Sequence, residues 1–370
     1  MNKYRIVIAS VLKPVTEPRA FASLAVSMRE TSKYHINIIG FCSKNPVKED
    51  GIQFTPVFCR KRTHLFRLFV PFKFLKEVMA YRPHVVIVTT YELLPLAIVA
   101  KALLKFKLIY DLQENYSQNV LLNRNGSPML RHLMAFLIRG IEKVVYRFID
   151  HYFFAEEGYR QQFPHIAQYT VLENKYAGPP EPLSLPISAE RPLFIISGTI
   201  TPVYGIEKAI HWFLSLRKKF PQARLHIVGH VPLEDFRIRV YELTSGQQGI
   251  SLNISPKPIH YAAVLDAIRQ ADVVLMPYDD LDSIRYKMPS KLYESVALHK
   301  PILISKNPIW EKFLQKYSAG LAVDFSKIED AAADFQSLLD LNLYKKSPGD
   351  EALWKSEKPK LLRILQQLLP

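Results

Sequence analysis

Short apolar runs of strand length alternate with helical segments along the first part of the chain. Runs at residues 5–11 and 35–41 are separated by a helix predicted at 20–30, and a third run follows at 52–58. Two parallel strands need a crossover connection of a dozen or more residues, which is usually a helix. This strand–helix–strand order predicts an α/β fold with a parallel sheet and helices on its faces.

The alternation starts again in the second half of the chain. Residues 178–186 are rich in proline, which is typical of a linker. Apolar runs at 193–197 and 224–229 then flank another predicted helix. We therefore predict two doubly wound domains. The predicted segments are a first domain at residues 1–177, a linker at 178–190, a second domain at 191–350 and a basic helix at about 351–370.

The charge of the chain indicates an anionic partner. Its 370 residues include 49 lysines and arginines against 34 aspartates and glutamates, a net charge of +15. Such an excess suits a nucleic acid, an acidic membrane surface or a phosphorylated ligand. The basic residues are interleaved through both predicted domains, and the chain has no recognisable nucleic-acid-binding module. We therefore expect no nucleic acid as a partner.

The chain shows no pattern typical of export or membrane insertion. No small-residue cleavage site follows the first apolar run, and no apolar stretch reaches the ~20 residues that span a bilayer. The two cysteines, Cys42 and Cys59, have neither metal-ligand spacing nor the spacing of a disulfide framework. We expect a cytoplasmic protein in a reducing compartment, with peripheral association with the inner face of the membrane as a further expectation.

Residues 60–79 have the most unusual composition in the chain. A basic amphipathic segment with aromatic residues is typical of a membrane-surface contact, where each cation near an anionic leaflet contributes ~1 kcal/mol. The alternative is a helix whose phenylalanines pack on the sheet and whose cations are solvated. Both interpretations stay open. The cations are Arg60, Lys61, Arg62, Arg67, Lys73 and Lys76, interleaved with Leu65, Phe66, Leu68, Phe69, Phe72, Phe74 and Leu75.

Residues 288–304 carry the clearest chemical signal. Pro289 and Ser290 predict a helix start, because serine is a favoured N-cap and proline stops the preceding segment. The helix is expected at 291–298, and Pro301 ends it before an apolar run of strand length.

The start of this helix combines groups that suit a nucleotide. Free backbone N–H groups and the positive end of the helix dipole attract anions. Lys291 adds a full positive charge there, and Glu294 lies one turn later on the same face. Phosphates would bind at the cation and dipole, and ribose hydroxyls at the carboxylate. The alternative is a surface Lys–Glu pair, which is common and contributes only ~0.2–0.5 kcal/mol.

This stretch resembles the donor-binding signature of family 4 glycosyltransferases with the GT-B fold. The family pattern is commonly Pro-x-Lys-Leu-Phe-Glu-Tyr-x-Ala-x-Gly-Lys-Pro, followed by an apolar strand. The matching residues here are Lys291, Leu292, Tyr293, Glu294, Ala297, Lys300 and Pro301.

The stretch departs from the family pattern in two places. His299 stands where the family has a glycine, but histidine is enriched at positive φ, so we expect the turn to be kept. Tyr286 stands where the family often has a second glutamate that contacts the donor sugar. The expected contacts are therefore those to phosphate and ribose.

Three other segments resemble the family in the expected order. A glycine-containing loop resembles its phosphate loop, with Tyr204 in place of a lysine. The end of one predicted strand resembles Tyr-Asp-x-His-Glu, with Gln113 in place of the histidine. Glutamine cannot take a proton, although it can hydrogen-bond a sugar hydroxyl. The first strand-to-helix loop resembles an Asp-x-Arg segment, with Glu17 and Arg19 in those places.

The resemblance implies two Rossmann-like domains that face a central cleft, with the C-terminal helix packed back on the first. The donor, a nucleotide sugar, would bind the second domain, and a glycan or lipid-linked acceptor the first. Hexosyl transfer would retain the anomeric configuration and serve cell-envelope or polysaccharide biosynthesis. We expect no cofactor or metal, because Lys291 and the helix start would neutralise the departing diphosphate. The implied residues are Asp111, Gln113 and Glu114 for catalysis, Gly198, Thr199, Tyr204, Gly205, Lys257, Pro258, Ser290, Lys291, Leu292 and Glu294 for the donor, and Thr16, Glu17 and Arg19 on the acceptor side.

Parts of the sequence are also compatible with three other interpretations. Asp280 and Asp282 match the metal-binding Asp-x-Asp of GT-A enzymes, but they lie late in the chain, so we expect a solvated acidic loop. A sugar-nucleotide epimerase shares the GT-B architecture and would release an altered donor without any acceptor. The residues at Gln113, Tyr204 and Tyr286 are also compatible with a GT-B protein that binds nucleotide but has lost activity.

Overall fold

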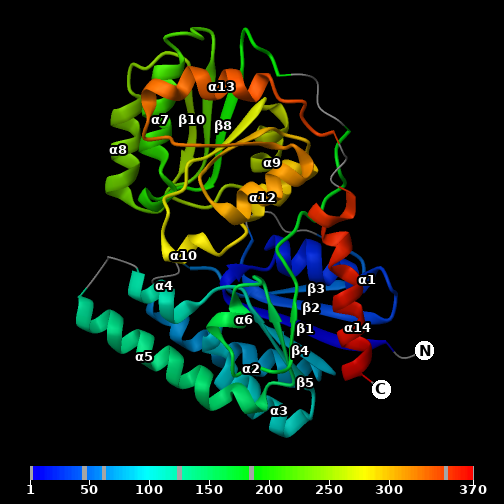
Figure 1. The fold of residues 1–370 in the computed structure, drawn as a ribbon. Helices are drawn as coiled ribbons and strands as arrows, with labels where there is room; N and C mark the ends of the chain where they lie inside the picture. The colour runs from blue at the N-terminus through cyan, green and yellow to red at the C-terminus, as the bar shows by residue number, and fades with distance from the viewer. Residues whose placement is uncertain are drawn as a thin grey trace. The chain divides into compact units, whose positions relative to one another are not determined.

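The computed structural model describes residues 3–43, 48–60, 64–122, 127–182, 187–345 and 349–369. The chain forms two compact units (Figure 1). The first consists of Met1–Gly178 with Trp354–Pro370, and the second is Pro179–Leu353. Each unit contains one sheet of parallel strands, so the predicted fold class is confirmed. Lys61, Arg62 and linker residues 183–186 lie outside the described residues.

Seven parallel strands form the sheet of the first unit. They are β1 (Tyr4–Pro14), β2 (Tyr34–Phe41), β3 (Ile52–Phe58), β4 (Val85–Val88), β5 (Lys107–Leu112), β6 (His151–Phe154) and β7 (Tyr169–Val171). Their order is β3-β2-β1-β4-β5-β6-β7. β1 pairs with both β2 and β4, so the strand order reverses there. Ligands of such sheets bind at the carboxyl ends of the strands near this switch point.

Helical segments connect these strands and cover both faces of the sheet. They are η1 (Arg19–Ala25), α1 (Val26–Arg29), η2 (Leu65–Phe69), α2 (Val70–Tyr81), η3 (Tyr91–Leu93), α3 (Leu94–Leu104), α4 (Tyr116–Leu122), α5 (Pro128–Val145), η4 (Tyr146–Phe148), α6 (Tyr159–Gln162), η8 (Trp354–Ser356) and α14 (Lys358–Leu368). η1 is a π-helix of seven residues, and the other η segments are 3-10 helices.

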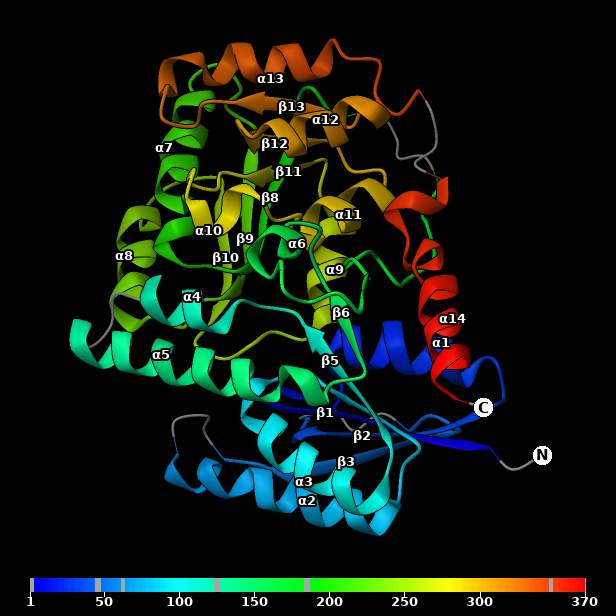
Figure 2. The same ribbon diagram turned by 60° about the horizontal axis from the view of Figure 1, so that its bottom comes forward.

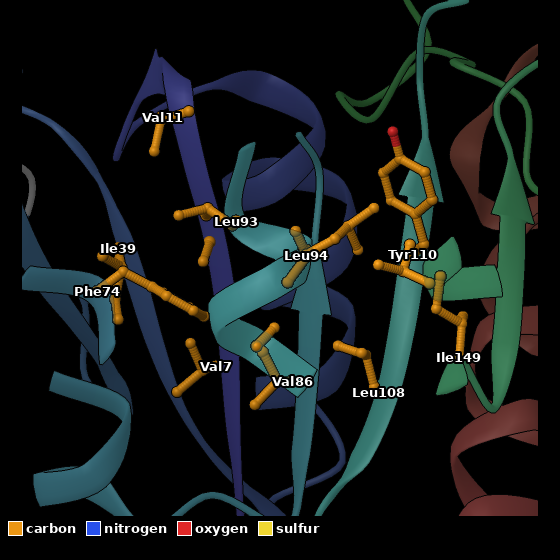
Figure 3. Close-up of a cluster of buried hydrophobic side chains, with 14 of the residues drawn as sticks. Val7, Val11, Ile39, Phe74, Val86, Leu93, Leu94, Leu108, Tyr110 and Ile149 are labelled. Atoms are coloured by element: carbon orange, nitrogen blue, oxygen red, sulfur yellow. The ribbon is translucent and has the colours of Figure 1, made fainter. Parts of the chain in front are cut away.

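One face of the seven-stranded sheet packs against α2, α3 and α5. Val7 of β1 and Val86 of β4 point to this side, where Phe74 of α2 and Leu94 of α3 lie over them (Figure 3). All four side chains are fully buried. The strands are apolar on both faces because helices cover both.

The opposite face packs against η1, α1 and the C-terminal helix α14. Ile8 of β1 lies in one apolar cluster with Leu361 and Leu365 of α14. Trp354 joins the same cluster, and its Nε1 donates a hydrogen bond to the Oγ of Ser27 at 2.8 Å. The last residues of the chain are therefore part of the first core.

The C-terminal helix begins later than the sequence predicted. The predicted start was about residue 351, whereas Gly349–Ala352 and Trp354–Ser356 form separate 3-10 turns and α14 starts at Lys358. Pro359 lies in the first turn of α14, where proline is tolerated because its missing N–H would have no partner in the helix.

Cys42 and Cys59 form a disulfide bond, although their spacing predicted none. They follow β2 and β3, which are neighbouring parallel strands, and Phe41 lies opposite Phe58 in the register. The two Cα atoms are therefore 4.9 Å apart, within the range of disulfides. Because 17 residues separate the two cysteines, their spacing in the sequence does not indicate this contact. The contact forms because the crossover between β2 and β3 brings the carboxyl ends of both strands to one edge of the sheet.

Six parallel strands form the sheet of the second unit. They are β8 (Leu193–Thr199), β9 (Arg224–His230), β10 (Ile250–Ser255), β11 (Val273–Met276), β12 (Ile302–Ser305) and β13 (Gly320–Val323). Their order is β10-β9-β8-β11-β12-β13, so β8 and β11 flank the switch point.

Helices also surround this second sheet, which Figure 2 shows from another side. They are η5 (Pro202–Tyr204), α7 (Ile206–Leu216), α8 (Glu234–Thr244), α9 (Tyr261–Gln270), α10 (Asp282–Arg285), α11 (Ser290–Ala297), α12 (Pro308–Tyr317), η6 (Ile328–Asp330), α13 (Ala331–Leu339) and η7 (Gly349–Ala352). Phe194 of β8, Trp212 of α7 and Phe335 of α13 form the centre of the core and are fully buried. Of the helices in the described ranges, none has both the length and the apolar composition to cross a bilayer.

The packing of α14 predicts a clear stability difference between two neighbouring positions. Leu365 is fully buried and Gln366 is exposed. Leu365→Ala should lower the free energy of unfolding by about 2–5 kcal/mol, because a cavity forms in a close-packed cluster. Gln366→Ala should change it by less than about 0.5 kcal/mol. Urea unfolding followed by circular dichroism tests this, and equal effects of both changes would show that α14 is not docked on the first core.

Candidate functional site

The carboxyl ends of β8 and β11 lie next to each other at the switch point of the six-stranded sheet. β8 pairs with β9 on one side and with β11 on the other. A small pocket opens at this place, and its lining includes Thr199, Tyr204, Tyr278 and Lys291. The position is the one at which open parallel sheets bind their ligands.

The loop after β8 depends on a glycine. Gly205 has a φ of +63°, which side chains other than glycine's rarely allow. A Cβ at this position would lie 1.8 Å from the carbonyl oxygen of Pro277, which follows β11. Only glycine lets the loop lie so close to the neighbouring strand. The ring of Tyr204 then lies 4.7 Å from that of Tyr278, and both rings line the pocket.

Helix α11 starts beside this pocket without a side-chain cap. Ser290 was predicted as the N-cap, but it is the first helical residue, and Pro289 is the N-cap. With a ψ of 136°, Pro289 has the extended backbone that the N-cap position requires. Proline has no side-chain oxygen that could cap the first turn, and the N–H of Leu292 donates to the carbonyl of Pro289 at 2.9 Å. Backbone N–H groups at such a helix start can bind water or an anion.

Lys291 connects the helix start to the glycine loop. A Cβ on Gly198 would lie 3.2 Å from the Cε of Lys291, so the lysine side chain lies against this glycine. Its ammonium group pairs with the carboxylate of Glu294 and lies 5.9 Å from the ring centroid of Tyr261. The Tyr261 hydroxyl donates to Oε1 of Glu294 at 3.2 Å. The side chains of Lys291 and Glu294 are 13% and 4% exposed, so this is a largely buried ion pair and not a surface pair.

The turn after α11 confirms the expectation for His299. This residue has a φ of +50°, in the left-handed region, where the family pattern has glycine. The N–H of Lys300 donates to the carbonyl of Ser295 at 2.8 Å and closes the turn before β12.

The other residues predicted to bind the donor differ in whether they line the pocket. Thr199 ends β8 and lines the pocket. Leu292 is fully buried, so it can serve the site only by anchoring α11. Lys257 and Pro258 follow β10, the edge strand two places from β8, and the N–H of Lys257 donates to Ser255 Oγ at 3.1 Å. They share the carboxyl edge of the sheet but not the pocket.

A second polar cluster lies at the carboxyl edge of the seven-stranded sheet. Arg19 donates to both carboxylate oxygens of Asp111, with distances of 2.6 to 3.1 Å. It also donates to the carbonyl of Leu172 and to Oδ1 of Asn174. The side chains of Arg19 and Asp111 are 4% and 0% exposed. Burial disfavours the charge of the guanidinium, but Asp111 outweighs this effect, so the pKa of Arg19 is raised.

Gln113 and Lys13 extend this cluster toward solvent. Nε2 of Gln113 donates to Oδ2 of Asp111 at 2.6 Å, and the ammonium group of Lys13 donates to Oε1 of Gln113. Lys13 also lies 3.5 Å from Glu17. Arg19 and Asp111 were predicted for the acceptor and for catalysis, respectively. In the structure they are one buried pair, so contact of either with a substrate requires their hydrogen bonds to open.

The remaining predicted residues of the first unit make separate contacts. Glu114 is partly exposed and accepts from Nδ2 of Asn119 at 2.9 Å. Thr16 donates to Ser43 at 2.9 Å. Lys13 therefore joins Glu17 to Gln113, and Gln113 is bonded to the pair of Asp111 and Arg19. Glu114 and Thr16 instead bond to Asn119 and Ser43.

Three residues of these clusters were not predicted from the sequence. Lys13 lies in the same loop segment as Glu17, which was identified by its resemblance to the family's Asp-x-Arg segment. Tyr278 directly follows an apolar run of strand length that ends at Pro277, and residues after such runs are candidates for a site. Tyr261 precedes Glu294 by 33 residues, and no sequence pattern connects the two.

Asp280 of the Asp-x-Asp motif forms a bidentate pair with Arg285, at 2.8 and 2.9 Å. This hydrogen-bonded pairing lowers the pKa of the carboxyl group. Within the part of the chain that the structure describes, no three His, Cys, Asp or Glu side chains gather as a metal site would require.

The second unit matches a known family. Residues 181–352 match the family model described as glycosyl transferases group 1. This range corresponds closely to the unit Pro179–Leu353, which contains the pocket and α11. No curated protein matches the chain.

Solved structures of several enzymes are similar to the whole chain. Sucrose-phosphate synthase from Thermosynechococcus elongatus is 12% identical, with 99% of each chain covered and a TM-score of 0.68. A glycosyltransferase from Rickettsia africae is 12% identical, with 100% of this chain and 99% of the other covered and a TM-score of 0.63. UDP-GlcNAc 2-epimerase from Neisseria meningitidis, bound to UDP-GlcNAc, is 11% identical, with 99% and 100% covered and a TM-score of 0.60. These likenesses establish the GT-B fold.

The buried pair in the first unit predicts a large stability effect. Asp111→Asn should lower the free energy of unfolding by about 3–5 kcal/mol, because Arg19 would stay buried without its counter-charge. The matched control is Glu157→Gln, whose carboxylate is 59% exposed and pairs with Arg160 at 2.7 Å. That change should cost less than about 1 kcal/mol. Thermal or urea unfolding measures both, and a control-sized effect of Asp111→Asn would contradict the role of the pair.

Proposed function

We propose that the chain, a glycosyltransferase of the GT-B fold whose second unit is a group 1 domain, transfers a hexosyl group from a nucleotide sugar to a glycan or lipid-linked acceptor. The reaction retains the configuration at the anomeric carbon and belongs to cell-envelope or polysaccharide biosynthesis. The donor binds the second unit, and the acceptor binds the carboxyl edge of the first sheet.

One observation carries the donor assignment. Lys291 lies against Gly198 at the uncapped start of α11, beside the pocket between β8 and β11. A diphosphate placed there would accept hydrogen bonds from backbone N–H groups of α11 and from an ammonium group. The glycines at 198 and 205 leave the backbone open to close approach. Tyr204, which replaces a family lysine, leaves Lys291 as the cation of this pocket's lining.

Glu294 supplies the site for the ribose. Its carboxylate is already oriented by Lys291 and the Tyr261 hydroxyl, and it lies one turn from the helix start. Ribose hydroxyls would donate to this carboxylate, while Lys291 turns toward the phosphates. The ion pair of Lys291 and Glu294 holds both side chains at the start of α11, where the donor would bind.

The chemistry that this arrangement supports is electrostatic. Bond cleavage at the anomeric carbon leaves negative charge on the diphosphate, and a lysine with a helix start stabilises that charge in a partly dry pocket. No metal is needed for this role. The rest of the rate enhancement comes from holding the donor and acceptor in line.

The cluster around Asp111 supplies the acceptor side. Gln113 is held by Asp111 and Lys13, and its amide can hydrogen-bond a sugar hydroxyl. Glu17 and Lys13 are the exposed end of the cluster, at 16% and 24%. Glu114 is the remaining partly exposed carboxylate of the segment. The buried pair of Arg19 and Asp111 holds the side chain of Gln113 in place at this edge of the sheet.

A sugar-nucleotide epimerase is the second candidate, because an epimerase bound to UDP-GlcNAc has the same fold. The two functions differ in their products. An epimerase converts the donor with no acceptor present, whereas a transferase releases a nucleoside diphosphate only as sugar moves to an acceptor or to water.

Lys291→Ala should weaken the binding of nucleoside diphosphates by ~1.5–3 kcal/mol, the range for a charged hydrogen bond. This corresponds to roughly a 10- to 150-fold rise in Kd. Titration calorimetry with UDP, GDP and ADP on the parent chain identifies the nucleotide, and the same titration on the variant measures the loss.

The matched control is Lys312→Ala, because Lys312 is an exposed lysine on α12 of the same unit. It should leave Kd unchanged within about twofold. A thermal melt checks that each variant is folded. Unchanged affinity in a folded Lys291→Ala variant would place the phosphates elsewhere.

A further inference from the structure

The first unit exposes its large apolar side chains on one face of its sheet. Among the described residues, all such exposed side chains of this unit lie between residues 65 and 148, on η2, α2, α3, α5 and η4. We call them the apolar surface. α2 contacts η2 and α3, and α3 contacts α5. Figures 1 and 2 both show α2, α3 and α5 on the side of the sheet away from α1 and α14. Scattered apolar residues are ordinary on a surface, whereas a gathered set indicates an interaction site.

Helix α5 carries two apolar stripes. The first includes Ile138 and Val145, which are buried against the core. The second faces solvent, with Met129 81%, Phe136 72% and Val144 70% exposed. A helix packed on a sheet needs only one such stripe. The outer stripe is therefore not part of the contact between α5 and the core.

The turn η2 also exposes apolar side chains that do not pack on the core. None of Leu65–Phe69 is buried, and Leu65 and Leu68 are 79% and 72% exposed. The guanidinium of Arg60 lies 4.8 Å from the ring centroid of Phe66. Of the two interpretations left open for this segment, core packing holds for Phe74 of α2 but not for η2.

The exposed charge on these helices is positive. Residues 60–148 include 15 lysines and arginines against 5 aspartates and glutamates, which accounts for +10 of the net +15. Lys76 of α2 and Lys143 of α5 are exposed. Two of the five acidic side chains of this region are engaged: Glu92 pairs with Arg67, and Glu142 accepts from a tyrosine hydroxyl of β5 at 3.1 Å. Burial raises the pKa of Glu142 to about 7, which reduces its negative charge further at neutral pH.

We propose that the apolar surface docks on an anionic lipid bilayer. Its leucine, methionine and phenylalanine side chains enter the boundary between headgroups and acyl chains, and the exposed cations contact anionic headgroups. A second copy of the chain fits less well, because two such surfaces repel each other. A nucleic acid would pair with the cations but leave the aliphatic side chains in water. This docking concerns the first unit and does not depend on how the second unit binds the donor.

Sedimentation with vesicles tests the proposal. The full chain is mixed with vesicles of phosphatidylcholine alone, or of phosphatidylcholine and phosphatidylglycerol in equal amounts. We expect binding to the anionic vesicles at least about tenfold stronger than to the neutral ones, falling as salt rises, because salt screens the attraction between surface charges.

Two independent variants locate the contact. One changes Met129, Leu133 and Phe136 of α5 to serine, and the other changes Leu65, Phe66 and Leu68 of η2 to serine. Each should reduce vesicle binding by roughly tenfold or more, because three side chains no longer enter the bilayer. All six side chains are exposed, so the thermal melt should not change.

The matched control removes exposed apolar side chains from the second unit, with Ile238, Tyr241 and Ile309 changed to serine. These are 51%, 49% and 40% exposed, and the control should bind vesicles like the parent chain. Lys291→Ala should also bind like the parent, which separates this proposal from the donor assignment. Equal or negligible binding to both kinds of vesicle would overturn the proposal. So would concentration-dependent self-association without vesicle binding, or variants that match the control.

Discussion

The parallel register of the two sheets is the constraint on which the rest of the structure depends. All strands of a parallel sheet end at the same edge, so residues far apart in the sequence meet there. In the second unit this register brings Gly198 at the end of β8, Pro277 after β11 and Lys291 of α11 together. In the first unit it brings Lys13, near the end of β1, next to Gln113, which follows β5. The polar clusters are therefore consequences of strand order.

Each unit contains a buried ion pair at this edge, and the two pairs suit different roles. Arg19 and Asp111 have nearly all of their hydrogen-bonding groups occupied by protein atoms, and neither side chain is more than 4% exposed. Such a pair costs desolvation free energy, and removing one partner is expensive, so it fixes a geometry. Lys291 is 13% exposed and lines a pocket at the start of α11, where the N-cap residue is a proline that provides no side-chain cap. This second pair can exchange its internal bond for a bond to an anion.

The sequence was sufficient to predict the fold class and the elements around Lys291. Strand–helix alternation predicted both sheets, and the residues from Lys291 to Pro301 predicted α11, its turn and β12, including the positive φ of His299. These features are local, so a pattern of neighbouring residues can specify them. The N-cap was assigned one residue too late, because the preference for serine was given more weight than the extended backbone of Pro289.

The features that the sequence did not predict depend on contacts between distant segments. Tyr261 bonds to Glu294 across 33 residues, and Cys42 joins Cys59 because β2 and β3 end together. The buried state of Arg19 and Asp111 could not be read from their residue types either, since both are usually exposed. Likewise, the outer stripe of α5 was hidden because a long apolar helix suggests core packing, and only the structure shows which face the core uses.

The central claim is that the start of α11, with Lys291, binds the diphosphate of the donor beside Gly198. A crystal structure of the chain with a bound nucleoside diphosphate tests it most directly. We expect phosphate oxygens within hydrogen-bond distance of the Lys291 ammonium and of backbone N–H groups in the first turn of α11, with the ribose hydroxyls at Glu294. A nucleotide bound at any other place, with the ion pair of Lys291 and Glu294 unchanged, would contradict it.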